Sequence, residues 1–510
     1  MNELVVVSDL HLGRGKNLDS GRYYELEAFF YDEDFHSFCV WLCNDARDRG
    51  VQLRLIFNGD TFDLLRLDPV PLPEESTAGT PRKSAFAPVL TPSRAAAEVA
   101  RILDGHPMFV AALAEVLAAG HEVIVLPGNH DIEVQWEPVQ AAMREALLSA
   151  SVLADREVGV AALGRLQFLP WFYYEPGRCW IEHGCQYDPE NAFRYPLRRG
   201  LVSLPDAVHE AELDNPLGNF FQRYLYNAFG HITFIVPSTR ANARYMKWLA
   251  VNNPQLLLGV VRSHWRFWWQ VVKRVLKYPS RARNRIADNH ARELAELAES
   301  TGLGDTLVAI DLLKDTRTDL VQAIRGFGWQ ALKLLLAVLL TGSLVLGIWF
   351  AGYNAINQAT LGFMGKSALF LMFSFVFLVS LFGALMYTLL RGTAAVPPEP
   401  MRRAAAELAR MLEVPVVSFG HSHDEVVWKN GKRGEKTATP SWYFNTGTWI
   451  AVFTHDVLLP RERVQFTFLR VRGRQGELLH WSPGRREPMP VVLLDEARPG
   501  RSAAPPDAPS

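Results

Sequence analysis

The pattern of apolar and polar positions predicts short buried strands near both ends of this chain. Five short apolar stretches are predicted as strands, because each is followed at once by a segment of turn and polar residues. They are Leu4–Val7, Leu53–Phe57, Val123–Leu126, Cys179–Ile181 and Val414–Phe419. Pro107–Ala119 and Arg402–Leu412 precede strands as the crossover helices of βαβ units do. The pattern therefore predicts an α/β fold.

Each predicted strand ends in residues of the types that bind metals. The five segments are Asp9-Leu10-His11, Gly59-Asp60-Thr61-Phe62-Asp63, Gly128-Asn129-His130-Asp131, His183-Gly184 and Gly420-His421-Ser422-His423. Because α/β folds bind ligands at the carboxyl ends of their strands, we expect these side chains to meet. A single Asp or His of this kind is more often a turn or capping residue. Five segments in this order predict a metal-dependent hydrolase.

These segments resemble the signature of the calcineurin-like metallophosphoesterases, which runs D-x-H, G-D-x-x-D, G-N-H-D/E, H and G-H-x-H. The resemblance covers Leu4 to His423 in scattered pieces, with long foreign insertions between His183 and His421. It implies a layered αββα sandwich and two metal ions. The implied ligands are Asp9, His11, Asp60 and His423 for one ion, and Asp60, Asn129, His183 and His421 for the other. Asp60 would bridge the two.

The residue types also suit this chemistry on their own account. Two divalent ions roughly 3.5–4 Å apart clamp the attacking and leaving oxygens of an in-line displacement. Carboxylate, imidazole and amide ligands suit Mn, Fe, Zn or Co, and we expect Mn. The resemblance implies that His130 faces the phosphoryl group and stabilises charge or protonates the leaving oxygen. Asp131 would orient the His130 ring or cap a helix that begins near Ile132, and Asp63 would be a ligand, a cap or a supporting residue.

Two long apolar stretches, Leu332–Tyr353 and Ser367–Leu390, lie between the fourth and fifth motifs. Each has the roughly 20 residues needed to cross a bilayer, so we expect a transmembrane hairpin with the short linker Asn354–Lys366. A hydrophobic hairpin packed inside the protein, or dipping into one leaflet, is the alternative. Two spans return His421 to the side of Asp9. Basic residues flank that side, so the positive-inside rule predicts a multi-pass protein of the cell inner membrane with a cytoplasmic catalytic domain.

The insertion before the first apolar stretch is strongly basic. Positions 240–292 carry twelve Lys or Arg residues, and Asp288 is the only acid. Aromatic and aliphatic residues interleave with them, which predicts amphipathic helix at a membrane surface that contains anionic lipids. Single-stranded nucleic acid is the rival partner, and a solvated basic helix packed on its own domain is the third interpretation. We favour the membrane because two apolar stretches follow in the same chain.

The composition limits the remaining possibilities. The chain has 510 residues, 49% of them hydrophobic, which suffices for two or three domains. A net charge of −1 excludes general nucleic-acid-type basicity, and the four cysteines contain no CxxC pair and are expected to be reduced. The N-terminus lacks the pattern of a cleaved signal peptide. The predicted organisation is a catalytic core in two parts (1–194 and 393–496), a basic insertion (195–328), a transmembrane hairpin (329–392) and a disordered tail (497–510).

Segments on either side of the insertions complete the expected fold. Strand candidates at Trp442–Asn445, Val464–Arg470 and Glu477–Trp481 are expected to build a second sheet against the first. Asn445-Thr446-Gly447-Thr448 would lie beside the site or form a simple turn. Asp68–Pro92, rich in Pro, Ser and Thr, is expected to be a mobile loop near the mouth of the site.

The substrate class is narrowed by a second resemblance. Ser8-Asp9-Leu10-His11-Leu12, together with the Gly-His-x-His motif, resembles the UDP-2,3-diacylglucosamine hydrolases, which split a pyrophosphate in a nucleotide-linked lipid. This chain departs from them in having His130 where they carry Arg, and in its long insertion with two apolar stretches. We therefore expect a phosphoester or pyrophosphate substrate attached to a lipid. A nucleotide or nucleic-acid phosphodiesterase, and a membrane scaffold that binds metal without turnover, are the alternatives.

Overall fold

The computed structural model describes residues 2–67, 90–204, 208, 211, 214–224, 234–236, 255, 280–314, 343–390, 399–430, 440–454, 457–458, 465–491 and 493. The chain forms two compact units, one of Met1–Leu320 with Pro398–Ser510 and one of Val321–Pro397. The basic residues at 240–279, the loop at 68–89 and the C-terminal tail lie outside the described residues, apart from position 255.

The first unit contains a seven-stranded sheet in the order β15-β14-β13-β1-β2-β3-β4. Its parallel half consists of β1 (Glu3–Val7), β2 (Leu53–Asn58), β3 (Glu122–Leu126) and β4 (Leu166–Phe168). Its antiparallel half consists of β13 (Phe466–Arg472), β14 (Gln475–Ser482) and β15 (Glu487–Pro490). The expectation that the C-terminal strands all build a second sheet is wrong for β13 and β14, because β13 pairs antiparallel with β1.

A five-stranded sheet has the order β5-β6-β8-β10-β9. Its strands are β5 (Phe172–Glu175), β6 (Cys179–Glu182), β8 (Val416–Phe419), β10 (Trp442–Thr446) and β9 (Glu425–Lys429). The three central strands, β6, β8 and β10, run parallel to one another. A small third sheet joins β12 (Val457–Leu458), β11 (Val452–Thr454) and β7 (Phe234–Val236).

Alternating side chains join the two larger sheets face to face. In β1, Leu4 and Val6 share one buried cluster with Ile181 of β6 and Val416 of β8, which places that face between the sheets. Val5 and Val7 point the other way, into a cluster with the helices of the first sheet. This alternation follows from the two-residue period of a strand, and it buries both faces of each sheet.

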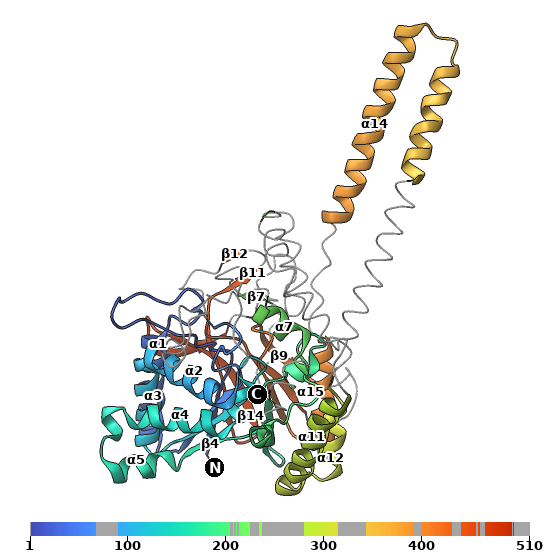
Figure 1. Ribbon diagram of the computed structural model, residues 1–510. Coiled ribbons are helices and arrows are strands. Elements are labelled where there is room, and N and C mark those ends of the chain that lie inside the picture. The colour runs from blue at the N-terminus through green and yellow to red at the C-terminus, as the bar shows by residue number, and fades with distance from the viewer. Residues whose placement is uncertain are drawn as a thin grey trace, which may run out of the picture. The chain divides into compact units, whose positions relative to one another are not determined.

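Helices cover the outer faces, as Figure 1 shows. Over the first sheet lie α1 (Asp32–Arg49), α2 (Pro92–Gly105), α3 (Pro107–Ala118), α4 (Glu137–Leu148) and α5 (Arg156–Leu163). Over the second lie α11 (Ser280–Thr301), α12 (Asp305–Asp311) and α15 (Glu399–Leu412). The mixed α/β class is thus confirmed, and so are the five predicted strands and both predicted crossover helices.

The described end of the basic insertion belongs to this packed core. Leu294 and Ala298 of α11 are buried in the cluster beneath the second sheet, while Arg285 and Arg292 are exposed. For these residues the structure matches the interpretation of a basic helix packed on its own domain.

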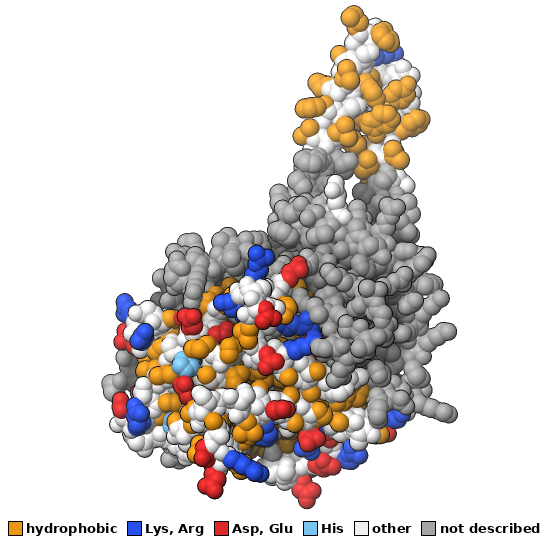
Figure 2. Space-filling view, turned by 60° about the vertical axis from the view of Figure 1, so that its left-hand side comes forward, with side chains coloured by type: hydrophobic (Ala, Val, Ile, Leu, Met, Phe, Trp, Pro, Cys, Tyr) orange, Lys and Arg blue, Asp and Glu red, His pale blue; other side chains and the backbone are white. Residues whose placement is uncertain are grey.

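The second unit contains a helix at 343–358 and α14 (Phe363–Leu390). Their aromatic rings interlock: Phe370 lies 5.4 Å from Trp349 and 5.6 Å from Tyr353, measured between ring centroids. The expected linker Asn354–Lys366 is mostly helical, since both helices extend into it. Large apolar side chains cover the described surface of this unit (Figure 2).

Among the described residues, one helix is long and apolar enough to cross a membrane, through the stretch Phe363–Ser380. The other expected span, Leu332–Tyr353, lies partly outside the described residues, so two spans are not confirmed.

Candidate metal centre

The parallel strands of both sheets end at one place. They deliver from the first sheet Asp9, His11, Asp60 and Asn129, and from the second His183, His421 and His423. Backbone contacts lock the loops together: the Gly420 amide donates to the His183 carbonyl at 2.9 Å, and the His421 amide donates to the Asp9 carboxylate at 3.0 Å. All of these ligand candidates, together with His130 and Asp131, are at most 5% exposed.

The backbone of the site is strained where the ligands stand. Non-glycine residues rarely adopt a positive φ, and such strain is concentrated at functional sites. Among the described residues, seven non-glycine residues have positive φ, and five of them are ligand candidates: Asp9, His11, Asp60, His421 and His423. Gly128 is required for a related reason, because a Cβ at this position would collide with the Asp60 carboxylate.

The first ligand group consists of Asp9, His11, Asp60 and His423. Nε2 of His11 lies 2.9 Å from Nε2 of His423, and the latter lies 3.3 Å from Oδ1 of Asp9. Nε2 of His11 also lies 3.8 Å from Oδ2 of Asp60. Two ring nitrogens and two carboxylates thus surround one small volume, as the ligands of a divalent cation do.

The second group centres on His183. Its Nδ1 donates to the Asn58 carbonyl at 2.9 Å, because a carbonyl can only accept. In the neutral ring, Nε2 therefore carries a lone pair, and it lies 3.2 Å from Oδ1 of Asn129 and 3.2 Å from Oδ2 of Asp60. Three acceptors that converge in this way repel one another unless a cation or a proton stands between them.

Asp60 belongs to both groups. His183, His421 and Asp60 form the second cluster of titratable ligands, and the same Asp60 completes the first. Its Oδ1 accepts from the backbone amide of His130 at 2.8 Å, while Oδ2 faces both His183 and His11. A bridging carboxylate, the role that the family resemblance implies for Asp60, would occupy such a position.

The electrostatic field of the cluster attracts positive charge. Burial opposes ionisation of Asp60, yet the surrounding histidines hold its pKa well below the ordinary value. Burial lowers the pKa of His183, but the charges of Asp60 and Asp9 raise it to about 10. A proton and a metal ion therefore compete for Nε2 of His183. Burial and the neighbouring His130 lower the pKa of His11 to about 4, which favours the neutral ring that binds metals.

His130 is positioned by a residue other than the one expected. Its Nδ1 lies 2.9 Å from Oδ1 of Asp63, and its ring lies 4.6 Å from that of His11. The Asp131 carboxylate instead accepts from the backbone amides of Gly128, Asp60, Thr61 and Phe62, at 2.7 to 3.1 Å. The expectation that Asp131 orients His130 is therefore wrong, and Asp131 makes no side-chain cap to the short helix at Ile132–Gln135. Asp131 braces two ligand loops against each other.

Three further segments hold the ligands, and only one of them was expected. Thr448 donates its hydroxyl to the Asp9 carbonyl at 2.6 Å, so the Asn445–Thr448 segment does lie beside the site. Asp188 bonds Nε2 of His421 at 2.9 Å, and Asn219 of α7 (Leu217–Tyr224) bonds Asn129. Asp188 and Asn219 belong to none of the five motifs and gave no signal in the sequence.

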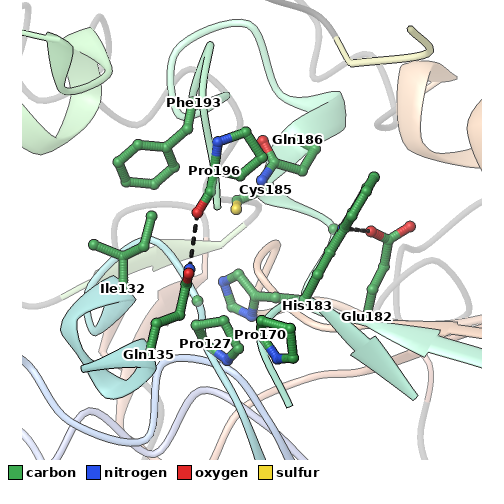
Figure 3. Close-up of a pocket in the computed structure, with 13 residues that line it drawn as sticks. Pro127, Ile132, Gln135, Pro170, Glu182, His183, Cys185, Gln186, Phe193 and Pro196 are labelled. Carbon is green, nitrogen blue, oxygen red and sulfur yellow. Dashed lines mark hydrogen bonds between the residues drawn. The ribbon is translucent and has the colours of Figure 1, made fainter. Parts of the chain in front are cut away.

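A small cavity lies behind His183 (Figure 3). Its volume is about 20 Å³, enough for one water molecule, so it is no substrate cleft. Pro127, Pro170 and Phe193 contribute apolar walls, and Trp171 donates its indole N–H to Glu182 at 2.7 Å. This packing fixes the backbone from which His183 projects.

The fold and ligand geometry stand alone as indications of function. The chain matches no protein-family model, and a search of curated proteins finds no match. Buried Asp and His groups that could hold a metal ion are therefore the firmest functional observation.

Proposed function

We propose that this protein is a dinuclear metal-dependent phosphohydrolase of the calcineurin-like metallophosphoesterase type, with Mn as the expected metal. One observation carries the proposal: two compact ligand groups, drawn from both sheets, share the carboxylate of Asp60. The two groups contain the seven ligands that the motif resemblance implies. The two face-to-face sheets with helices outside agree with the αββα sandwich of that family.

The ligand atoms fit divalent cations. Carboxylate, imidazole and amide oxygen donors converge, and neutral donors keep the site from becoming too anionic for a phosphate group. Bound ions of this kind supply charge that clamps the oxygens of an in-line displacement and activates water as the nucleophile. Asp60 would hold the two ions close together, and Asn129, His183 and His421 would complete the ligand set of the second ion.

His130 is the residue that we propose acts on the substrate. Its Nδ1 is held by Asp63, so it would act through Nε2, the opposite ring nitrogen. There it would stabilise the charge that develops on the phosphoryl oxygens or donate a proton to the leaving oxygen. Buried and braced in this way, the ring needs little reorganisation during the reaction.

We further propose that the enzyme acts at the cytoplasmic face of the cell inner membrane on a phosphorylated lipid or a nucleotide-linked lipid. The apolar stretch of α14 and the apolar surface of the second unit support a membrane anchor. The basic residues at 240–292 would attract anionic lipid. A hairpin of two spans keeps His421 and His423 on the same side as Asp9.

Hydrolysis by the detergent-solubilised protein with Mn²⁺ tests the proposal. The panel contains a phosphomonoester, a phosphodiester, a UDP-linked diacyl sugar and common phospholipids, and His130→Ala is the control. Selective cleavage of a lipid-linked substrate, lost in the variant, is the expected result. Cleavage of soluble diesters alone would favour a nucleotide phosphodiesterase. Bound metal without cleavage of any substrate would favour a scaffold.

A further inference from the structure

The second metal site depends on a helix outside the motifs. Asn219, the third residue of α7, is 2% exposed and makes two hydrogen bonds to Asn129 through its side-chain amide. Nδ2 of Asn129 donates to Oδ1 of Asn219 at 3.2 Å, and Nδ2 of Asn219 donates to the backbone carbonyl of Asn129 at 2.7 Å. The backbone carbonyl holds Nδ2 of Asn219, so Oδ1 of Asn219 faces Nδ2 of Asn129. Oδ1 of Asn129 is thereby turned toward Nε2 of His183. A rotated amide would present N–H groups there, and those cannot bind a metal.

The same end of α7 also supports His421, another candidate ligand of the second ion. The Gly218 amide donates to the Glu190 carbonyl at 2.7 Å, and a Cβ on Gly218 would collide with the side chain of Asn191. Asn191 in turn donates to Asp188 at 2.9 Å, and Asp188 bonds Nε2 of His421 at 2.9 Å. Consecutive residues of α7 therefore support both ligands. Asn219 bonds Asn129, and Gly218 packs against Asn191, which bonds the Asp188 carboxylate that holds His421.

We propose that Asn219 is a positioning residue for the second metal ion, and that docking of α7 and occupancy of that site are coupled. This inference rests on the proposed function, because it presupposes that two ions bind. Coupling between two binding events is reciprocal, so a metal ion that needs an oriented Asn129 also stabilises the docked helix. The ligands of the first ion other than Asp60 come from the loops after β1 and β8, so the effect is selective for the second ion.

Titration with Mn²⁺ followed by calorimetry tests this selectivity. In Asn219→Ala we expect the affinity for the second ion to fall about 10- to 100-fold, the usual effect of losing an outer partner of a metal ligand. The affinity for the first ion stays unchanged. Gln222→Ala is the matched control, since it removes an amide from the same helix, and it should bind both ions as the wild type does. Equal binding of both ions by wild type and Asn219→Ala would overturn the inference.

A double-mutant cycle separates positioning from a general effect on folding. If Asn219 acts through Asn129, the variant Asn129→Ala/Asn219→Ala binds the second ion no more weakly than Asn129→Ala alone. Additive losses would mean that Asn219 acts by another route and would refute the positioning role.

Hydrogen exchange measures the helix side of the coupling. Amides at 217–224 should gain protection when the wild type takes up its second Mn²⁺, and should gain none in Asn129→Ala. Unchanged exchange in the wild type on binding the second ion would contradict the coupling. The two hypotheses fail differently: a wild type that binds fewer than two ions refutes the proposed function, whereas two ions bound independently of Asn219 refute only this inference.

Discussion

Nδ1 of His130 lies 2.9 Å from Oδ1 of Asp63, and both side chains are buried beside the ligands of the first metal group. Burial lowers the pKa of His130, but the charges of Asp63 and Asp60 raise it above the ordinary value. Oδ1 of Asp63 also accepts from the Arg66 amide at 3.1 Å, which fixes the carboxylate. Asp63 therefore holds Nδ1 of His130, and this fixes the orientation of the ring and the direction of Nε2.

Removing this brace should impair turnover more than metal binding. In Asp63→Ala we expect kcat to fall about 10- to 100-fold while two Mn²⁺ ions remain bound, as for other losses of an outer hydrogen-bond partner. Steady-state kinetics and metal analysis measure both quantities. Asp63→Asn, which keeps an acceptor oxygen, should lie between wild type and Asp63→Ala. Loss of a metal ion from Asp63→Ala would instead mean that Asp63 supports metal binding, as a ligand or through His11, whose Nδ1 lies 3.7 Å from Oδ2 of Asp63.

Replacing the shared carboxylate should affect both metal groups. Asp60→Asn preserves size but removes the charge that faces His11 and His183, so we expect bound Mn²⁺ to fall below two ions per chain and hydrolysis to be lost. Metal analysis after dialysis, together with the hydrolysis assay, measures this. Asp311→Asn is the control, because Asp311 is a buried aspartate that pairs with Lys314 far from the motifs in sequence. Full activity in Asp60→Asn would refute its bridging role.

Asp131 should matter for stability. Its carboxylate accepts four buried backbone amides from two loops, and an unsatisfied buried donor costs about 1–3 kcal/mol. Asp131→Ala should therefore lower the free energy of unfolding by about 3 kcal/mol or more. Thermal unfolding in detergent measures the change. A normal melting temperature with lost activity would restore a direct catalytic role.

The sequence predicted which side chains would meet at the candidate site, because each follows a buried strand and strand ends are fixed by strong local patterns. It did not distinguish Asp63 from Asp131, since both lie in motif loops and their partners depend on how the loops fold back. Asp131 accepts from four amides because the loops after β2 and β3 pack against each other at Gly128 and Asp60. No local sequence pattern predicts such a contact between loops.

Contacts distant in sequence were equally hard to predict. Asn219 lies 90 positions from Asn129, inside an insertion whose composition suggested membrane binding. The strand β13 was expected in the second sheet. Its pairing with β1, more than 460 residues earlier, depends on the assembled core.

The buried imidazole of His106 predicts pH-dependent stability. Burial lowers its pKa, but hydrogen bonds to Asp32 at 3.0 Å and an ion pair with Glu27 at 3.4 Å raise it to about 9. The folded pKa thus lies above the unfolded value near 6.5, so the stabilisation is complete below pH ~6.5 and is lost as the pH rises through about 9. The loss should approach ~3 kcal/mol.

Denaturant unfolding at several pH values measures this effect. His106→Gln, which can bond one carboxylate but cannot be protonated, is expected to lack that part of the decline between pH 6.5 and 9. The difference between the two proteins isolates His106 from other titrating groups. Parallel pH profiles for both proteins would show that His106 does not titrate in this range.

The helical hairpin of the second unit has a membrane topology that cysteine labelling can test. Its turn lies at 359–362, beside the exposed residue Gln358, and Lys366 donates to the Asn357 carbonyl there. If the hairpin crosses the bilayer, a cysteine at Gln358→Cys is labelled by an impermeant maleimide on intact spheroplasts. A cysteine at exposed Asp48→Cys on α1 is labelled only after permeabilisation. A Cys43→Ser background removes the half-buried native thiol. Labelling of both positions only after permeabilisation would mean that the hairpin stays on the cytoplasmic side, dipping into one leaflet instead of spanning the membrane.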